Sequence, residues 1–217
     1  MMPRGIVSSM LLGCALVAAG CGRESPTQPG TYALTGHVQL IGHVTGTNGQ
    51  HLETRVVSDA DGVPVELLYV NTVVARTHTT DGAFRFTGVA PGGYHVRALI
   101  FGSLDTLSAG VTFPNRDVDV GPPIVLESVG DIYPAPNPIE PATVVTFRTA
   151  NLSSAALRVL ALDGTVIRQL YASQMLDPGL YLAEWNGSDA QGVPLPQGYY
   201  WLTFEAGTDQ RAQLVFR

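Results

Sequence analysis

Lysine is absent from this chain of 217 residues, and cysteine and charged residues are scarce. All twelve basic residues are arginine, only 14% of residues are charged, and the formal net charge is −6. The two cysteines, Cys14 and Cys21, both lie in the first 21 residues. Disulfides, thiol catalysis and Cys-ligated zinc are therefore excluded for the rest of the chain. Without a basic cluster, binding to nucleic acid or to a membrane through a polybasic patch is excluded as well.

The N-terminal segment predicts export. Arg4 precedes an apolar run from Ile6 to Ala19 that contains no charged residue. A positive start, a short apolar core and small residues before a cleavage site are typical of a secretory signal peptide, here residues 1–20. The run is shorter than the ~20 residues that a transmembrane helix needs.

Small residues before Cys21 resemble the lipobox of bacterial lipoproteins. The segment reads Leu16-Val17-Ala18-Ala19-Gly20-Cys21 and departs from the motif at Ala18, where leucine is commonest. The resemblance implies that Cys21 receives a diacylglycerol and becomes the new N-terminus. Residues 21–31 would then be a polar tether to the membrane. Cleavage after Ala19 without lipidation is the alternative, and the protein is exported in either case.

Residues 32–128 form the first predicted domain. Apolar residues alternate with polar ones from Tyr32 to Val44, which predicts a long, half-buried strand. Asp81-Gly82 separates two further strands, Val73–Thr79 and Ala83–Thr87, and this dipeptide is typical of a tight β-hairpin. In that hairpin, threonines of the first strand would lie opposite phenylalanines of the second.

Three motifs of this block resemble the carboxypeptidase regulatory-like domain, a β-sandwich of seven or eight strands of the transthyretin type. They are Asp61-Gly62-Val63-Pro64-Val65, Thr80-Asp81-Gly82-Ala83-Phe84-Arg85-Phe86 and Gly88-Val89-Ala90-Pro91-Gly92-Gly93-Tyr94. The resemblance covers about residues 33–127 and implies the same sandwich. The stretch from Val44 to Asp59 is longer than is usual in the family, and we expect it to be a loop.

Residues 131–217 form the second predicted domain. The prolines between Tyr133 and Thr143 exclude a helix or a central strand there, and six strands separated by turns follow. Alternation along one of these strands predicts that its last residue, Trp185, is a core anchor. The expected strands are Val144–Arg148, Ala155–Leu162, Val166–Tyr171, Gly179–Trp185, Tyr199–Ala206 and Ala212–Phe216.

The order of motifs in this block resembles the Ig-like domain of the flagellar hook-capping protein and the related C-terminal sorting domain of type IX secretion. The motifs are Pro136-Asn137-Pro138 with Pro141 and Thr143, Leu162-Asp163-Gly164, Trp185-Asn186-Gly187-Ser188-Asp189 through Gly192 to Pro194, and Pro196-Gln197-Gly198-Tyr199-Tyr200. Ile139 stands where the family usually has phenylalanine, and Asn186 where aspartate is usual. The resemblance implies a second sandwich. The predicted fold class is therefore all-β, with two tandem antiparallel β-sandwich domains of transthyretin-like and Ig-like type.

Five histidines raise the question of a metal site. His37 and His43 lie on one predicted strand, about 20 Å apart at ~3.3 Å per residue, and cannot share an ion. His78 and His95 lie on outward faces and could approach each other across strands, although solvated surface histidines are the favoured interpretation. The H-x-x-E zinc motif of carboxypeptidases fails at His51 because a threonine follows where glutamate is required.

Two acidic segments resemble calcium loops, but turns explain them better. Asp59-Ala60-Asp61-Gly62 is followed by Val63-Pro64, where an EF-hand needs an oxygen ligand and glycine. Asp177, Asn186 and Asp189 could line a calcium-stapled turn, which is the less favoured alternative. The sequence has no nucleophile elbow, P-loop or dinucleotide fingerprint. We therefore assign no catalytic, cofactor-binding or metal-ligating residue and expect no cofactor.

One aromatic cluster is a candidate ligand contact. Tyr199, Tyr200 and Trp201 are consecutive, so at least one of them should face outward from its strand and could stack against a sugar ring. Packing inside the domain is the alternative.

Together these features predict an exported, non-enzymatic protein of the cell envelope that is held at the outer membrane or cell surface by a lipid on Cys21, or is otherwise secreted. It would act as a structural, adhesion or binding module. One alternative is type IX secretion cargo with a C-terminal sorting domain, and another is a carbohydrate-binding accessory protein. The sequence implies the membrane as a partner, and it does not specify a protein or polysaccharide ligand.

Overall fold

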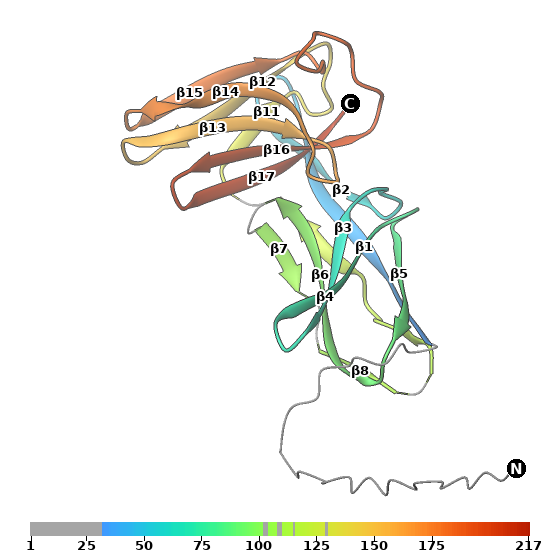
Figure 1. The fold of residues 1–217 in the computed structure, drawn as a ribbon. Coiled ribbons are helices and arrows are strands. Elements are labelled where there is room, and N and C mark those ends of the chain that lie inside the picture. Colours follow the sequence, from blue (N-terminus) through green and yellow to red (C-terminus); the bar gives the residue numbers. More distant parts are fainter. Residues whose placement is uncertain (1–31, 102–103, 108–109, 115, 129) are drawn as a thin grey trace, which may run out of the picture.

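The computed structural model describes residues 32–101, 104–107, 110–114, 116–128 and 130–217, which form seventeen strands and no helix. The strands build two lobes joined end to end (Figure 1). The all-β prediction is confirmed, with mainly antiparallel sheets. Within the described ranges no helix is long and apolar enough to span a membrane. The predicted signal peptide and Cys21 lie outside the described residues.

One long strand, β1, organises the first lobe. Its first half pairs antiparallel with β5 and its second half with β2, while the short strands β9 and β10 pair with it in parallel. The predicted alternation is present, because Leu34, Val38 and Leu40 are buried while His37 is exposed. The strands of this sheet are β1 (Tyr32–Thr45), β2 (His51–Val57), β5 (Ala83–Val89), β9 (Val118–Asp119) and β10 (Ile124–Glu127).

A second sheet faces the first across the core of this lobe. Its strands follow the order β4-β3-β6-β7, and β8 pairs with the start of β6. Tyr94, Val96 and Ala98 of β6 are buried, as their alternation with polar residues predicts. The strands are β3 (Pro64–Tyr69), β4 (Thr72–His78), β6 (Gly92–Phe101), β7 (Leu104–Leu107) and β8 (Val111–Phe113).

The turn at Asp81-Gly82 is present, but the predicted hairpin is wrong. Both residues have positive φ, 48° and 70°, and the turn is closed by hydrogen bonds between Thr80 and Ala83 of 2.8 and 2.9 Å. However, β4 pairs with β3 and β5 pairs with β1, so Thr77 and Thr79 do not oppose Phe86 and Phe84. A two-residue turn can return a strand within one sheet or carry it into the facing sheet, and here it does the latter.

The segment from Val44 to Asp59, expected to be a loop, contains a strand. β2 pairs with β1 from Leu40 to Thr45, so only the short turn between the two strands and the two residues after β2 are irregular. Most of β2 is exposed, from His51 to Glu53 in particular, so its sequence lacks the alternation that marks a half-buried strand.

The second lobe packs a sheet of three strands against a sheet of four. The orders are β11-β12-β15 and β14-β13-β16-β17. β11 is an edge strand, a position that tolerates the prolines of this segment. Trp185 is 1% exposed, and its indole donates a 2.9 Å hydrogen bond to the Ser188 carbonyl, which confirms it as a core anchor. The strands are β11 (Ile132–Ala135), β12 (Thr143–Thr149), β13 (Ser153–Leu160), β14 (Val166–Leu176), β15 (Gly179–Trp185), β16 (Tyr199–Ala206) and β17 (Asp209–Phe216).

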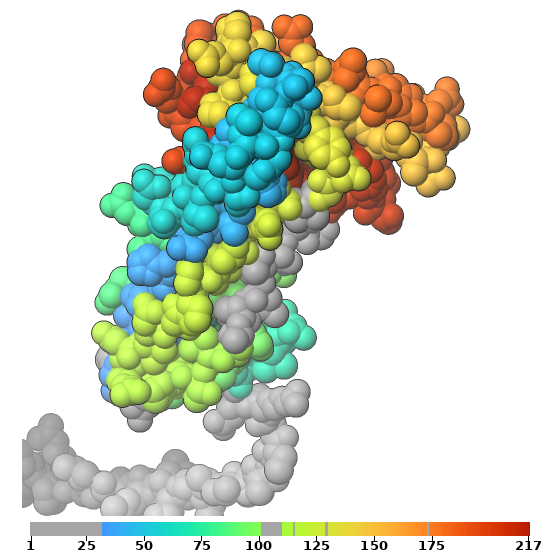
Figure 2. Space-filling view, turned by 180° about the vertical axis from the view of Figure 1, so that it is seen from behind, coloured from blue at the N-terminus to red at the C-terminus, as the bar shows by residue number. Residues whose placement is uncertain are grey.

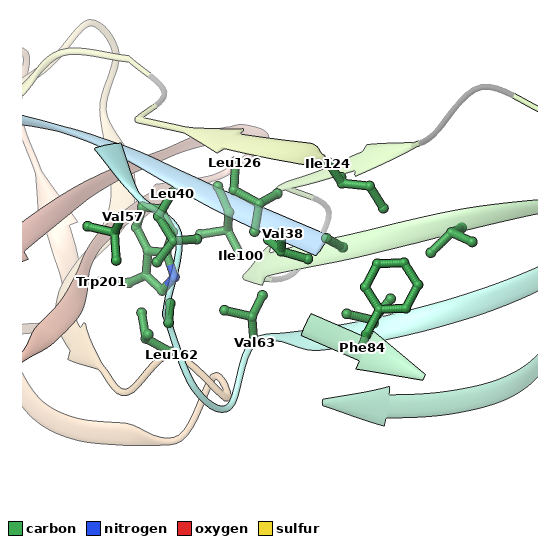
Figure 3. Packing of buried hydrophobic residues seen from close by; sticks show 14 of the residues in the cluster. Val38, Leu40, Val57, Val63, Phe84, Ile100, Ile124, Leu126, Leu162 and Trp201 are labelled. Carbon is green, nitrogen blue, oxygen red and sulfur yellow. The ribbon is translucent and has the colours of Figure 1, made fainter. Parts of the chain in front are cut away.

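The sheets of the two lobes are separate, whereas the buried core crosses between them. Trp201 and Leu162 of the second lobe lie beside Leu40, Val57 and Ile100 of the first (Figure 3). The second-lobe members of this shared core are Leu160, Leu162, Trp201, Ala212, Leu214 and Phe216. The rest of the second lobe has a core of its own around Trp185 and Phe147.

Candidate binding site at the junction of the two lobes

Asn137, the middle residue of the Pro136-Asn137-Pro138 motif, holds the junction together. It is fully buried, and its side-chain amide donates to the carbonyls of His43 and Leu214 at 2.7 and 3.0 Å. Its side-chain oxygen accepts a 2.9 Å hydrogen bond from the Phe216 backbone. Backbone hydrogen bonds of 2.8 and 3.0 Å pair it with Thr45 at the end of β1. One asparagine thus links β1, β17 and the proline-rich segment, and it uses both polar groups of its side chain.

Two more contacts across the junction fix the β1–β2 hairpin against the second lobe. The Ser128 hydroxyl lies 3.3 Å from the Ile41 carbonyl, to which it donates, and 3.3 Å from the Leu214 amide, from which it accepts. The guanidinium of Arg55 on β2 lies over the ring of Phe216, 4.7 Å from its centroid. In Figure 2 the cyan hairpin reaches over the second lobe, beside the yellow-green segment that contains β11.

Beside these contacts lies an open groove of about 290 Å³. One wall comes from the β1–β2 hairpin, and the other comes from the start of β11 and from β17. The lining residues are His43, Thr45, Gly49, His51, Ser128, Gly130, Asp131, Ile132, Tyr133, Pro134 and Gln213. Neither lysine nor arginine is among these described lining residues, and Asp131 is the only carboxylate.

The hairpin brings together two histidines that sequence reasoning did not pair. The rings of His43 and His51 lie 5.4 Å apart, edge to face. His51 Nε2 lies 3.3 Å from the Thr54 hydroxyl, while His43 Nδ1 is buried and has no hydrogen-bond partner among the described residues. Only the register of β2 on β1 reveals this proximity, and the polar sequence of β2 gave no sign of a strand.

Tyr133 and Asp131 form the opposite wall. The Tyr133 hydroxyl donates a 2.7 Å hydrogen bond to the Asp131 carboxylate, and the tyrosine remains 54% exposed. This hydrogen bond, together with partial burial and the carboxylate charge, raises the pKa of the Tyr133 phenol. The hydrogen bond also fixes the ring, so one aromatic surface is held open to solvent.

A second hollow of about 350 Å³ adjoins the groove on the outer face of the β11-β12-β15 sheet and shares Asp131 and Tyr133 with it. Strand register places Tyr133, Thr146 and Leu182 in one row across this face. Leu180 and Leu182 are each 63% exposed. The groove and the outer face are therefore neighbouring surfaces that meet at Tyr133.

The aromatic cluster singled out from the sequence does not form the site. Trp201 is 0% exposed in the shared core, Tyr200 is buried, and Tyr199 is half-buried with its ring 5.7 Å from that of Phe216. The expectation that one of them faces solvent assumed an isolated domain. The first lobe covers the face on which Trp201 lies.

The alternative of a calcium-stapled turn is contradicted by the fold. Asp177 and Asp189 flank β15 on opposite ends, about 20 Å apart by the rise of a strand. The Asp189 carboxylate accepts hydrogen bonds from the backbones of Gln191 and Val193, and Arg168 donates to the Ser188 hydroxyl at 2.6 Å and to the Asp189 carbonyl at 2.9 Å. An arginine thus provides the positive charge in this loop.

The other acidic and histidine candidates are also separated. The Asp61 carboxylate accepts a 2.6 Å hydrogen bond from the Asp81 backbone, as the turn interpretation expects. His78 and His95 lie on strands either side of β3, opposite Pro64 and Leu68 respectively, roughly 15 Å apart by strand geometry. Among the described residues, no group of three or more histidine, cysteine or acidic side chains could hold a metal ion.

No family model and no curated protein matches the sequence. A proposed carbohydrate-binding protein from Bacteroides uniformis is similar with a TM-score of 0.39 and 12% identity, over 87% of this chain and 99% of that one. A DUF3823 family protein from Parabacteroides merdae is similar with a TM-score of 0.31 and 14% identity, over 85% of this chain and 97% of that one. Dimeric latent PorU from Porphyromonas gingivalis is similar with a TM-score of 0.31 and 14% identity, over 72% of this chain and 16% of that one. Similarities of this size assign no function to the present chain.

Proposed function

We propose that this protein is an exported, lipid-anchored and non-enzymatic component of the cell envelope, at the outer membrane or cell surface, that acts as a structural or binding module. The observation that supports it best is the course of β1, which starts at Tyr32 beside the tether and ends at Thr45 in the junction (Figure 1). Its fourteen residues extend about 45 Å at ~3.3 Å each. A lipid on Cys21 would therefore hold the second lobe well away from the membrane.

The joint between the lobes supports this role because it combines buried apolar contacts with hydrogen bonds. Trp201 is 0% exposed within the shared core, and every polar atom of the Asn137 side chain is used across the junction. An interface of this kind resists hinge motion, since bending would expose apolar surface and leave buried polar groups unpaired. The chain would thus present its second lobe in one orientation.

The two motif resemblances support a module without catalysis. The regulatory-like block occurs here without the H-x-x-E motif of its associated enzymes, because Thr54 stands in the glutamate position. The hook-capping and sorting-domain resemblance implies an Ig-like partner sandwich.

Type IX secretion cargo is the second candidate, and the shared core weighs against it. Removal of residues 131–217 as an address would take away Leu162, Trp201 and Phe216, which cover Leu40 and Val57 of the first lobe. At about 25 cal/mol per Å² of apolar surface, such exposure is costly for a protein that works outside the cell. A sorting domain that is cut away is expected to leave a self-sufficient passenger.

Intact-mass analysis of membrane-fraction protein tests the proposal. We expect a diacylglycerol-modified chain that begins at Cys21 and retains the second lobe. The matched variant Cys21→Ser should move to the soluble fraction with an unchanged thermal melt. A mature protein that ends near residue 130 would favour the type IX alternative, and an unmodified, soluble wild type would contradict the anchor.

A further inference from the structure

We propose that the junction groove and the adjoining outer face of the β11-β12-β15 sheet form one binding site for a neutral oligosaccharide, with the Tyr133 ring as a stacking surface between them. This inference deepens the proposed function, because it rests on the second lobe being a binding module and names its ligand class. One sugar unit would occupy the groove, and the next would lie over Tyr133 toward Leu182.

The geometry of Tyr133 is the first argument. Its ring is 54% exposed although it is anchored, since the hydroxyl is tied to Asp131 and the backbone pairs with β12. A fixed, open aromatic surface packs well against the apolar C–H face of a pyranose and loses little conformational entropy on binding. The adjacent hollow of about 350 Å³ continues from this ring along the sheet and gives a second unit space.

The polar lining of the groove is the second argument. Asp131, His51 and Gln213 bring a carboxylate acceptor, an imidazole and an amide that both donates and accepts. Such mixed donors and acceptors, set among apolar carbon, suit the vicinal hydroxyls of a sugar. Arg148 at the far side of the second hollow adds further donors.

Charge selects among the possible ligands. Across the groove and the adjoining hollow, the described lining has one carboxylate, Asp131, and one guanidinium, Arg148, so the two opposite charges balance. The site therefore has no excess positive charge that would attract phosphorylated ligands or acidic polysaccharides. A divalent cation has only two neighbouring histidines here, and the described residues supply no third ligand in a group with them. A neutral, hydroxyl-rich ligand fits best.

Calorimetric titration of the full chain carrying Cys21→Ser tests the site without membrane. The probes are cellohexaose, xylohexaose, mannohexaose and chitohexaose, with hexagalacturonate as the acidic counterpart. We expect at least one neutral hexasaccharide to bind and hexagalacturonate not to bind. Tyr133→Ala should weaken binding about tenfold or more, which corresponds to about 1.4 kcal/mol. Tyr133→Phe, which keeps the ring, should retain most of the affinity.

The matched control is Val166→Ala on β14, which removes an equally exposed apolar side chain from the other sheet of the same lobe. Affinity should not change in this variant. Absence of binding by all four neutral sugars overturns the proposal, as does equal binding by Tyr133→Ala or preferred binding of hexagalacturonate. None of these outcomes bears on the anchor, because membrane partitioning of the wild type tests that separately.

Discussion

The two lobes have similar amounts of sheet but close their cores differently. The second lobe surrounds a core of its own around Trp185 and Phe147. The first lobe ends in an apolar surface that Trp201, Leu162 and Phe216 of the second lobe cover. The comparison teaches that the limits of hydrogen-bonded sheets need not coincide with the limits of a folding unit. Here the dependence is mutual, since separation would uncover Leu40 and Val57 on the first lobe and Trp201 and Phe216 on the second.

Separate expression of the two lobes tests most directly whether each lobe folds without the other. We expect residues 131–217 to give a cooperative thermal transition, because the core around Trp185 remains complete. Residues 32–128 should bind a hydrophobic dye and melt at a lower temperature than the full chain, because Leu40 and Val57 lose their cover. If the isolated first lobe melts cooperatively near the temperature of the full chain, the dependence is refuted.

Substitution of Trp201 sharpens the comparison within the intact chain. Trp201→Ala should lower the free energy of unfolding by about 3–5 kcal/mol and reduce hydrogen-exchange protection in both lobes. Because the Trp201 indole nitrogen has no hydrogen-bond partner among the described residues, Trp201→Phe loses only packing and should cost under about 2 kcal/mol. Loss of protection confined to the second lobe would contradict the shared core.

Gly82 probes the first lobe alone. Its φ is 70°, and a Cβ there would collide with the Ser58 carbonyl oxygen, whereas Gly62 has a φ of 81° and open space around it. Gly82→Ala should therefore cost about 2–4 kcal/mol and Gly62→Ala about 1 kcal/mol. Gly82→Val should cost at least as much as Gly82→Ala. Chemical denaturation of the three variants measures the difference, and equal costs would remove steric contact as its cause.

The smallest effect is expected from an ion cluster on the facing sheet. Burial raises the pKa of Glu66, but hydrogen bonds and charge from Arg97 and Arg76 outweigh it, so the pKa lies below its ordinary value of 4.5. A lowered folded-state pKa contributes stability above the ordinary value, and the contribution is lost as pH falls through the lowered one.

Glu66→Gln should accordingly flatten the acid side of the stability profile measured by thermal melts from pH 7 to pH 3. Glu53→Gln is the control, because it removes an exposed pair with Arg55, and such pairs contribute little. An acid limb that keeps its slope in Glu66→Gln would assign the pH dependence to other groups.

The sequence was sufficient where a local pattern determines the structure. Alternation identified β1, and the burial of Trp185 followed from its place at the end of a half-buried strand. Asp81-Gly82 specified a tight turn because few residues tolerate positive φ at both positions. In each of these cases, the determining interactions lie within a few residues along the chain.

The features of the fold and of the candidate site that the sequence does not predict depend on contacts between distant segments of the chain. The sequence predicts that at least one of Tyr199, Tyr200 and Trp201 faces solvent, but the residues that cover Trp201 belong to the other lobe and lie far away in the sequence. β2 is mostly exposed and gains its structure from pairing with β1, so neither it nor the His43–His51 contact had a pattern of its own. Tyr133 lies in a proline-dense segment whose sequence excludes a helix and a central strand, and the segment forms an edge strand with one open face, which the prolines alone do not specify.

The path of β1 also has a mechanical consequence. A pull between the tether before Tyr32 and a ligand on the second lobe would act along the strand. Neighbouring strands are hydrogen bonded to it from Tyr32 to Thr45, so many bonds would resist sliding at once instead of opening one after another. Asn137 is hydrogen bonded to His43 and Thr45 at the C-terminal end of the same strand. With the proposed lipid on Cys21 and a ligand bound to the second lobe, the molecule would therefore transmit tension along β1 without first unravelling.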